Sequence, residues 1–211
     1  MRKIHIQRQV RKHTMKKLRL GCVVMAAGDS KRFRGNKLLA LYDGKMLIER
    51  ALQAVPDKEF CKVAVVSQYP EILDMAKRYG FIPVLNSAPE EGVSLTIRLG
   101  LDALGKVDGA MFMVADQPLL TRSSVEAEIG FFKREPGSIA AMACGKRRGN
   151  PAIFPKDLFV ELRELRGDVG GSIVICAHPD KLRLYQIEEE LELFDADSAE
   201  ELEKSKGKKE S

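Results

Sequence analysis

The feature of this sequence that most constrains its fold is a regular alternation of short apolar runs with segments of helical periodicity. Strand-length apolar runs predict β-strands, and apolar residues at helical spacing predict helices between them. The expected strands are apolar on both sides, as in parallel sheets covered by helices on both faces. We therefore predict an α/β fold, a single Rossmann-like domain of three layers with a mostly parallel twisted sheet. The strands are expected at 20–26, 62–67, 82–85, 110–115, 138–143, 152–154 and 182–187, and the helices at 46–55, 70–79, 93–104, 121–133, 156–165, 172–177 and 198–204.

Length and composition limit the class of protein. A chain of 211 residues without a Pro/Gly/Ser-rich linker suits one domain, which we place at 19–204, between a basic leader at 1–18 and a charged tail at 205–211. Hydrophobic residues make up 45% and charged residues 31%, which excludes a disordered chain. No apolar run approaches the roughly 20 residues of a membrane span, and the first residues lack the apolar core of a secretory signal. We expect a cytoplasmic protein that does not contact membranes.

The net charge of +5 comes from the N-terminus. Residues 1–20 hold eight of the 35 basic residues and none of the 30 acidic ones, so the remainder carries a net charge of −3. A basic arm can bind nucleic acid, but this arm lacks interleaved aromatic residues and any binding motif. Nucleic acid is therefore not the expected partner. The four cysteines show no C-x-x-C spacing, so they predict neither a zinc site nor a disulfide framework.

The loop after the first strand carries the strongest chemical signal. The strand ends in Ala26, Ala27 and Gly28, and small residues let a ligand approach the backbone closely. The following residues include Ser30 and several cations, and free amides with cations are what a triphosphate needs. The loop has neither Walker spacing nor a G-x-G-x-x-G pattern. In α/β sheets, ligands bind beyond the carboxyl ends of the strands, which is where this loop lies.

Six segments in order resemble the MobA-like nucleotidyltransferases. The first is Ala26-Ala27-Gly28-x-Ser30-x-Arg32-Phe33-x-Gly35-x-Lys37, and the others are Glu91-Gly92-Val93-Ser94-Leu95, Ala115-Asp116-Gln117-Pro118, Gly149-Asn150-Pro151-Ala152-Ile153-Phe154, Leu165-Arg166-Gly167-Asp168-x-Gly170-Gly171 and Asp195-Ala196-Asp197-Ser198-Ala199-Glu200-Glu201-Leu202. The resemblance implies a fold of the nucleotide-diphospho-sugar transferase type. It also implies an enzyme that transfers a nucleoside monophosphate from an NTP to an acceptor phosphate.

Within that family, the residues are most similar to the molybdenum cofactor cytidylyltransferases. Ala-Ala-Gly in the first loop, Asp-Gln-Pro and Pro-Ala-Ile-Phe carry this likeness, which implies CTP as donor and a molybdopterin-type acceptor. The side chain of Ala27 would narrow the base pocket in favour of a pyrimidine. The family implies transient contact with an apo-molybdenum hydroxylase or an insertion chaperone. The sequence departs from the family at Ser172, where an arginine is usual.

The resemblance assigns roles to individual residues. Asp116 and Asp197 would be ligands of Mg²⁺, a cation that one or two carboxylates hold together with phosphates and water. Arg32 and Lys37 would bind the phosphates and stabilise the leaving pyrophosphate, so Arg32, Lys37 and Asp116 form the predicted catalytic set. Other readings remain open, because Asp116 could form the turn before Pro118 and an aspartate at position 197 could begin the last helix. The predicted nucleotide-binding residues are Ala26, Ala27, Gly28, Ser30, Arg32, Lys37, Ser94 and Asp116, and the predicted acceptor-binding residues are Asn150, Pro151 and Asp168.

Two other functions stay open at this stage. The first is a nucleotidyltransferase of the same fold that uses another NTP or another acceptor, such as a sugar or polyol phosphate. The Ser172 departure keeps this alternative open. The second is a cofactor-binding chaperone without turnover, against which the intact Asp116, Arg32 and Lys37 argue.

Overall fold

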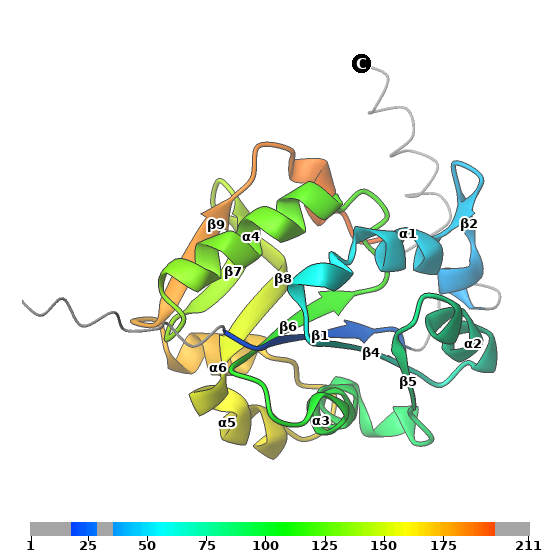
Figure 1. Ribbon diagram of the computed structural model, residues 1–211, viewed down its shortest axis with the longest axis horizontal. Helices are drawn as coiled ribbons and strands as arrows, with labels where there is room; N and C mark the ends of the chain where they lie inside the picture. The colour runs from blue at the N-terminus through cyan, green and yellow to red at the C-terminus, as the bar shows by residue number, and fades with distance from the viewer. Residues whose placement is uncertain (1–17, 29–35, 197–211) are drawn as a thin grey trace, which may run out of the picture.

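The computed structural model describes residues 18–28 and 36–196, which form a twisted seven-stranded sheet with the order β5-β4-β1-β6-β8-β7-β9 (Figure 1). Every pair of neighbouring strands is parallel except the pairs made by β8, which is antiparallel to β6 and to β7. The mostly parallel α/β sheet predicted from the sequence is confirmed. The strands are β1 (Leu20–Met25), β4 (Lys62–Ser67), β5 (Ile82–Leu85), β6 (Gly109–Val114), β7 (Ile139–Cys144), β8 (Arg147–Pro155) and β9 (Leu182–Gln186).

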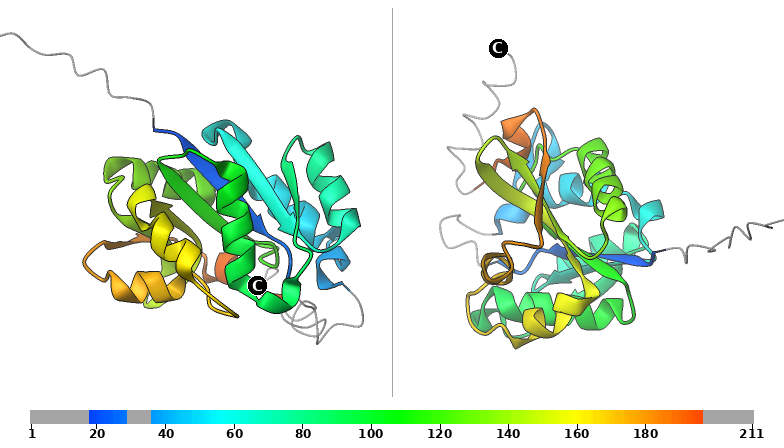
Figure 2. Two further views of the ribbon diagram at one scale, coloured as in Figure 1. Left: turned by 90° about the horizontal axis from the view of Figure 1, so that it is seen from below. Right: turned by 90° about the vertical axis from the view of Figure 1, so that its left-hand side faces the viewer.

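Helices cover both faces of the sheet (Figures 1 and 2). One face carries α1 (Leu47–Ala54), α2 (Pro70–Arg78) and α4 (Arg122–Arg134), and the other carries α3 (Val93–Leu104), α5 (Phe159–Glu164) and α6 (Ser172–Ala177). Short 3₁₀ turns η1 (Lys37–Leu39), η2 (Asp57–Glu59), η3 (Pro89–Glu91), η4 (Lys156–Leu158) and η5 (Glu190–Leu193) join these elements. No helix among the described residues is long and apolar enough to cross a membrane.

The sheet separates two hydrophobic cores, and β1 contributes to both. Cys22 and Val24 pack with α1, α2 and α4, whereas Val23 packs with α3, α5 and α6. All three side chains are fully buried. This follows from the alternation of side chains along a strand, and it explains why the strands are apolar on both sides.

The expected helices are found within a few residues of the predicted ends, and local sequence explains several boundaries. The hydroxyl of Thr121 accepts a hydrogen bond from the backbone N–H of Ser124 and caps α4. Pro70 begins α2, and Gly80 follows its end with a φ of 75°. The helix predicted at 198–204 lies outside the described residues, as do residues 1–17 of the leader and the tail at 205–211.

Two elements differ from the sequence-based expectation. The strand predicted at 152–154 is nine residues long and starts at Arg147, because hydrogen bonds to β7 extend it through a polar stretch. The hairpin of β2 (Leu41–Tyr42) and β3 (Lys45–Met46) was not expected. Its turn is Asp43–Gly44, with φ values of 46° and 73°. This dipeptide favours two-residue hairpin turns.

Candidate active site

The carboxyl ends of β1, β4 and β6 converge where the predicted nucleotide loop begins. The backbone N–H of Ala26 donates to the carbonyl of Val66 (2.9 Å), and Ser67 Oγ donates to the carbonyl of Ala26 (2.8 Å). Gln68 Nε2 donates to the carbonyl of Ala27 (3.0 Å). The carbonyls of Ala26 and Ala27 are thus held by residues at the end of β4, and these bonds fix the orientation of the backbone where the loop begins.

The start of this loop, as far as Gly28, offers backbone amides to a ligand. Within the described part of the chain, the backbone N–H groups of Ala27 and Gly28 donate to no acceptor. A Cβ atom added at Gly28 would have no described atom within 4 Å apart from those of Gly28 and its chain neighbours. Unpaired amides beside small side chains suit anionic oxygens. Ser30 and Arg32, which the sequence predicts to bind the nucleotide, lie outside the described residues.

Lys37 and Asp116 meet at this edge of the sheet. Asp116 follows β6, and Lys37 begins η1, whose N-cap Asn36 accepts a hydrogen bond from the N–H of Leu38 (3.0 Å). Lys37 Nζ donates to Asp116 Oδ2 at 2.7 Å, and the two side chains are only 17% and 21% exposed. The sequence placed both residues in the catalytic set, and the fold brings them into direct contact.

The Asp116–Gln117 turn is joined to the end of the described chain. The backbone N–H of Ala196 donates to the carbonyl of Asp116 (2.9 Å). Gln117 is 2% exposed, and its Nε2 donates to Asp195 Oδ1 (3.0 Å). Asp197, which follows Ala196, lies outside the described residues. The chain that leads to it is held against Asp116 as far as Ala196.

The residues at this edge suit a hard divalent cation. Among residues 18–28 and 36–196 there is no group of three or more His, Cys, Asp or Glu side chains that could enclose a metal by itself. Mg²⁺ does not need such a cage, because one or two carboxylates suffice when phosphates and water complete the octahedron. The half-buried carboxylate of Asp116 at a strand end fits that requirement.

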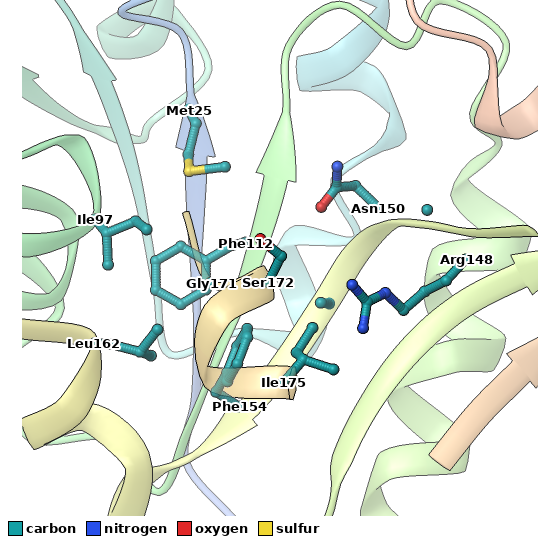
Figure 3. Close-up of a pocket in the computed structure, with 12 residues that line it drawn as sticks. Met25, Ile97, Phe112, Arg148, Asn150, Phe154, Leu162, Gly171, Ser172 and Ile175 are labelled. Carbon is teal, nitrogen blue, oxygen red and sulfur yellow. The ribbon is translucent and has the colours of Figure 1, made fainter. Parts of the chain in front are cut away.

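A pocket of about 170 Å³ lies on the α3–α5–α6 side of the sheet, next to the end of β1 (Figure 3). Asn150, predicted to bind the acceptor, lines it together with Ser172. Pro151 is buried beside Asn150, and the peptide bond between them is cis. One cavity therefore contains both Asn150, from the predicted acceptor-binding set, and Ser172, where the family usually has an arginine.

Two predicted ligand residues lie elsewhere. Asp168 does not line the pocket, and its Oδ1 accepts from the backbone N–H of Val93 at 3.4 Å. Ser94 is fully buried, and Arg98 Nη1 donates to its hydroxyl (3.4 Å). Their ligand contacts stay predictions, and these bonds give both residues a structural role at the start of α3.

Sequence reasoning missed several residues that shape the site. Ser67 and Gln68 orient the nucleotide loop, Gln117 and Asp195 join the two aspartate-bearing turns, and Arg148 lines the pocket. Ser67 and Gln68 follow a predicted parallel strand, so their position at the carboxyl edge was a usable signal.

The fold is shared with several solved structures. The crystal structure of an Rv0371c homologue from Mycobacterium sp. strain JC1 is 23% identical, with a TM-score of 0.75 over 90% of this chain and 98% of that one. CMP:2-keto-3-deoxy-manno-octonic acid synthetase complexed with CTP is 12% identical, with a TM-score of 0.72 over 91% and 98%. Rv0371c from Mycobacterium tuberculosis H37Rv in complex with manganese is 19% identical, with a TM-score of 0.64 over 81% and 89%. No curated protein matches the chain in sequence.

The mostly parallel sheet with helices on both faces places the chain in the α/β fold class of these structures. The sequence is more specific. Residues 22–182 match the MobA-like NTP transferase domain, and the chain belongs to that family. The resemblance found in the sequence motifs is thereby confirmed, and the protein is a nucleotidyltransferase by family.

Proposed function

We propose that the protein transfers CMP from CTP to the phosphate of molybdopterin or molybdenum cofactor and releases pyrophosphate. The observation that carries the proposal is the contact of Lys37 with Asp116 at the carboxyl edge of the sheet (2.7 Å). The amides of Ala27 and Gly28, which have no acceptor among the described residues, lie at the same edge. A cation, a carboxylate and free amides in one place suit phosphoryl chemistry, which depends on positioning and charge neutralisation.

The proposed metal is Mg²⁺, held by Asp116 and Asp197. Support comes from the hydrogen bond between Ala196 and Asp116, which brings the chain to within one residue of Asp197. The complex of the structurally similar Rv0371c with manganese supports a divalent cation in this fold. When bound, the cation would offset charge on the triphosphate and on the attacking phosphate.

The side chains of this protein would do the rest of the work. The amides of Ala27 and Gly28 and the side chain of Arg32 would hold the triphosphate. Lys37 would exchange its bond to Asp116 for one to the β- and γ-phosphates. An acceptor phosphate oxygen then forms a bond to the α-phosphorus of CTP while the α–β bridging bond breaks. The electron pair of that bond leaves with pyrophosphate, which Lys37 and Arg32 stabilise.

The choice of CTP and of the acceptor rests on the sequence likeness to molybdenum cofactor cytidylyltransferases. The structurally similar CMP:2-keto-3-deoxy-manno-octonic acid synthetase was solved with CTP, which shows that this fold accommodates a cytidine nucleotide. We further propose that the protein acts in the cytoplasm and meets an apo-molybdenum hydroxylase or an insertion chaperone transiently.

A second acceptor class is favoured by one observation. Ser172 stands where the family usually carries an arginine, and it lines the pocket described above. A sugar or polyol phosphate would then replace the pterin, with the same donor chemistry.

The deciding experiment is pyrophosphate release with Mg²⁺ and each of CTP, GTP, ATP and UTP, with and without molybdenum cofactor. Release with CTP and cofactor together supports the proposal. Release with a sugar or polyol phosphate instead supports the second acceptor class. Tight cofactor binding without release from any nucleotide would identify a non-catalytic chaperone.

A further inference from the structure

The pocket beside β1 combines an apolar floor with a polar rim (Figure 3). The floor is made by Met25, Ile97, Phe112, Phe154, Leu162 and Ile175. The rings of Phe112 and Phe154 meet edge to face, with centroids 5.8 Å apart. The polar side chains are those of Arg148, Asn150 and Ser172, and Arg148 is the one charged residue among those that line the pocket.

The backbone of β8 explains why polar side chains gather there. Ala141 pairs with Ala152, but Ala143 pairs with Arg148, so three residues of β8 stand opposite one residue of β7. Such a bulge re-aims side chains, and bulges are frequent beside active sites. Here it lies at Gly149, Asn150 and Pro151, directly after Arg148.

Arg148 has no partner within the described part of the chain. No carboxylate pairs with it, and its side chain makes no hydrogen bond there. Its neighbour Arg147 behaves differently, since it donates to the carbonyl of Leu193 (2.9 Å) and pairs with Glu190 (3.5 Å). In Figure 3 the guanidinium of Arg148 extends from β8 to the pocket, near Asn150 and Ile175.

A half-buried guanidinium without a counter-ion is a site prepared for an anion. Partial burial removes water from the charge, and the planar fork of Arg binds carboxylate or phosphate through two parallel hydrogen bonds. The amide of Asn150 and the hydroxyl of Ser172 are additional hydrogen-bonding groups on the same rim.

The pocket also lies beside the donor site. Met25 is the last residue of β1, and Ala26 follows it directly into the nucleotide loop. Phe112 belongs to β6, whose end leads to Asp116. A molecule in the pocket would therefore adjoin both the triphosphate and the proposed metal ligand.

We propose that Arg148 is a specificity-determining residue that binds the phosphate of the acceptor, whose apolar ring or chain rests on the pocket floor. The inference rests on the proposed nucleotidyl transfer and narrows its acceptor to a phosphate monoester joined to an apolar or planar group. The oxygen held by Arg148 belongs to the phosphate that forms the new bond to the α-phosphorus, and pyrophosphate remains the leaving group.

The test compares Arg148→Ala with Lys146→Ala in the full chain. Both variants lose one positive charge, but Lys146 is exposed in the turn between β7 and β8. We expect Arg148→Ala to raise the KM for the acceptor by about 10- to 100-fold, as for a lost hydrogen bond to a charged group. The KM for CTP should stay unchanged, and Lys146→Ala should match the wild type. Equal acceptor KM values in Arg148→Ala and the wild type would overturn the proposal.

A binding readout keeps this inference separate from the reaction. In ¹H–¹⁵N spectra of the arginine Nε groups, phenyl phosphate should shift the signal of Arg148 and leave that of Arg147 in place. Inorganic phosphate, which lacks the apolar group, should do so only at higher concentration. If phenyl phosphate shifts Arg148 but no acceptor supports turnover, the proposed reaction fails and the pocket assignment stands. If phenyl phosphate leaves Arg148 unshifted, the pocket assignment fails whatever the turnover.

Discussion

Lys37 Nζ lies 2.7 Å from Asp116 Oδ2, although 79 residues separate the two in the chain. The contact joins η1, which follows the nucleotide loop, to the turn after β6. Lys37, which is predicted to bind phosphates, and Asp116, which is predicted to bind a metal, thus form an ion pair with each other. A nucleotide with its metal would satisfy both groups at once, so the same contact positions the two side chains for their proposed roles.

Replacing Asp116 with asparagine should abolish turnover without unfolding the protein. The amide keeps the shape but not the charge, and we expect kcat to fall by at least about 10²-fold, as for other lost electrostatic groups. The side chain is only 21% exposed, so losing one charge of this mostly buried ion pair should also lower stability, by about 1–3 kcal/mol. Pyrophosphate release at saturating Mg²⁺ and thermal unfolding measure the two effects. Asp102→Asn, which removes an exposed acid, is the matched control. Near wild-type turnover of Asp116→Asn would refute the metal assignment.

Gln117 should act as a positioning residue through Asp195. Its Nε2 donates to Asp195 Oδ1, whereas its Oε1 is buried without a partner among the described residues. Gln117→Met keeps the volume and removes the bond that holds the segment before Asp197. We expect the Mg²⁺ concentration for half-maximal rate to rise several-fold, with the KM for the acceptor unchanged. The exposed Gln53→Met serves as control. An unaltered Mg²⁺ requirement together with a lowered Tm would show a purely structural role.

Ala27 is predicted to favour a pyrimidine through its side chain. The residue is 6% exposed, and Gln68 fixes its carbonyl, so the backbone should keep its place in Ala27→Gly. The added space should raise kcat/KM for GTP relative to CTP. Measuring kcat/KM for GTP and for CTP in the wild type and in Ala27→Gly tests this prediction. An identical preference would remove Ala27 from the account of base selection.

Gly92 is expected to be intolerant of any side chain. Its φ is 83°, and an added Cβ would lie 2.5 Å from the backbone N of Asp168 and 2.5 Å from the backbone C of Gly167. Gly80 has a similar φ of 75° but open space, so Gly80→Ala isolates the cost of the backbone conformation, about 1–2 kcal/mol. Gly92→Ala should lower stability further, by about 1–3 kcal/mol for the clash. Chemical denaturation of both variants gives the difference, and equal losses would contradict the predicted clash.

Much of the fold could be predicted because it depends on local pattern. The central parallel strands are apolar on both faces, and helices such as α4 carry their own caps. The length of β8 could not be predicted, because the polar half of this strand joins the sheet through the pairing of Arg147 and Arg148 with β7. The hairpin at Asp43–Gly44 had a readable turn signal, but its two-residue strands are too short to show alternation.

The candidate site shows the same division. Motifs identified Lys37 and Asp116, and the parallel topology explains why strand ends bring them together. The hydrogen bond between Gln117 and Asp195 joins residues 78 positions apart, and no local sequence pattern predicts such a contact. Nothing in the sequence distinguishes Arg148 from Arg147, because their different surroundings depend on the pairing of β8 with β7, and only Arg148 lines the pocket.

Glu128 should make the stability of this protein fall as pH rises. The residue lies in α4, is fully buried, and neither carboxylate oxygen has a partner among the described residues. Burial raises the pKa of its carboxyl well above the ordinary 4.5. Between 4.5 and the raised pKa, the unfolded chain releases a proton that the folded one retains, so the free energy of unfolding decreases with pH by up to about 1.4 kcal/mol per unit.

The variant Glu128→Gln cannot ionise and should lose this slope. Its free energy of unfolding should approach that of the wild type near pH 5 and exceed it by at least about 1 kcal/mol at pH 8, where the wild type has lost part of its stability. Urea denaturation at several pH values measures the difference. Glu126→Gln removes an exposed acid that pairs with Arg122 in the same helix, and its pH dependence should follow that of the wild type. If Glu128→Gln and the wild type lose stability in parallel from pH 5 to pH 8, a carboxylate other than Glu128 sets the slope.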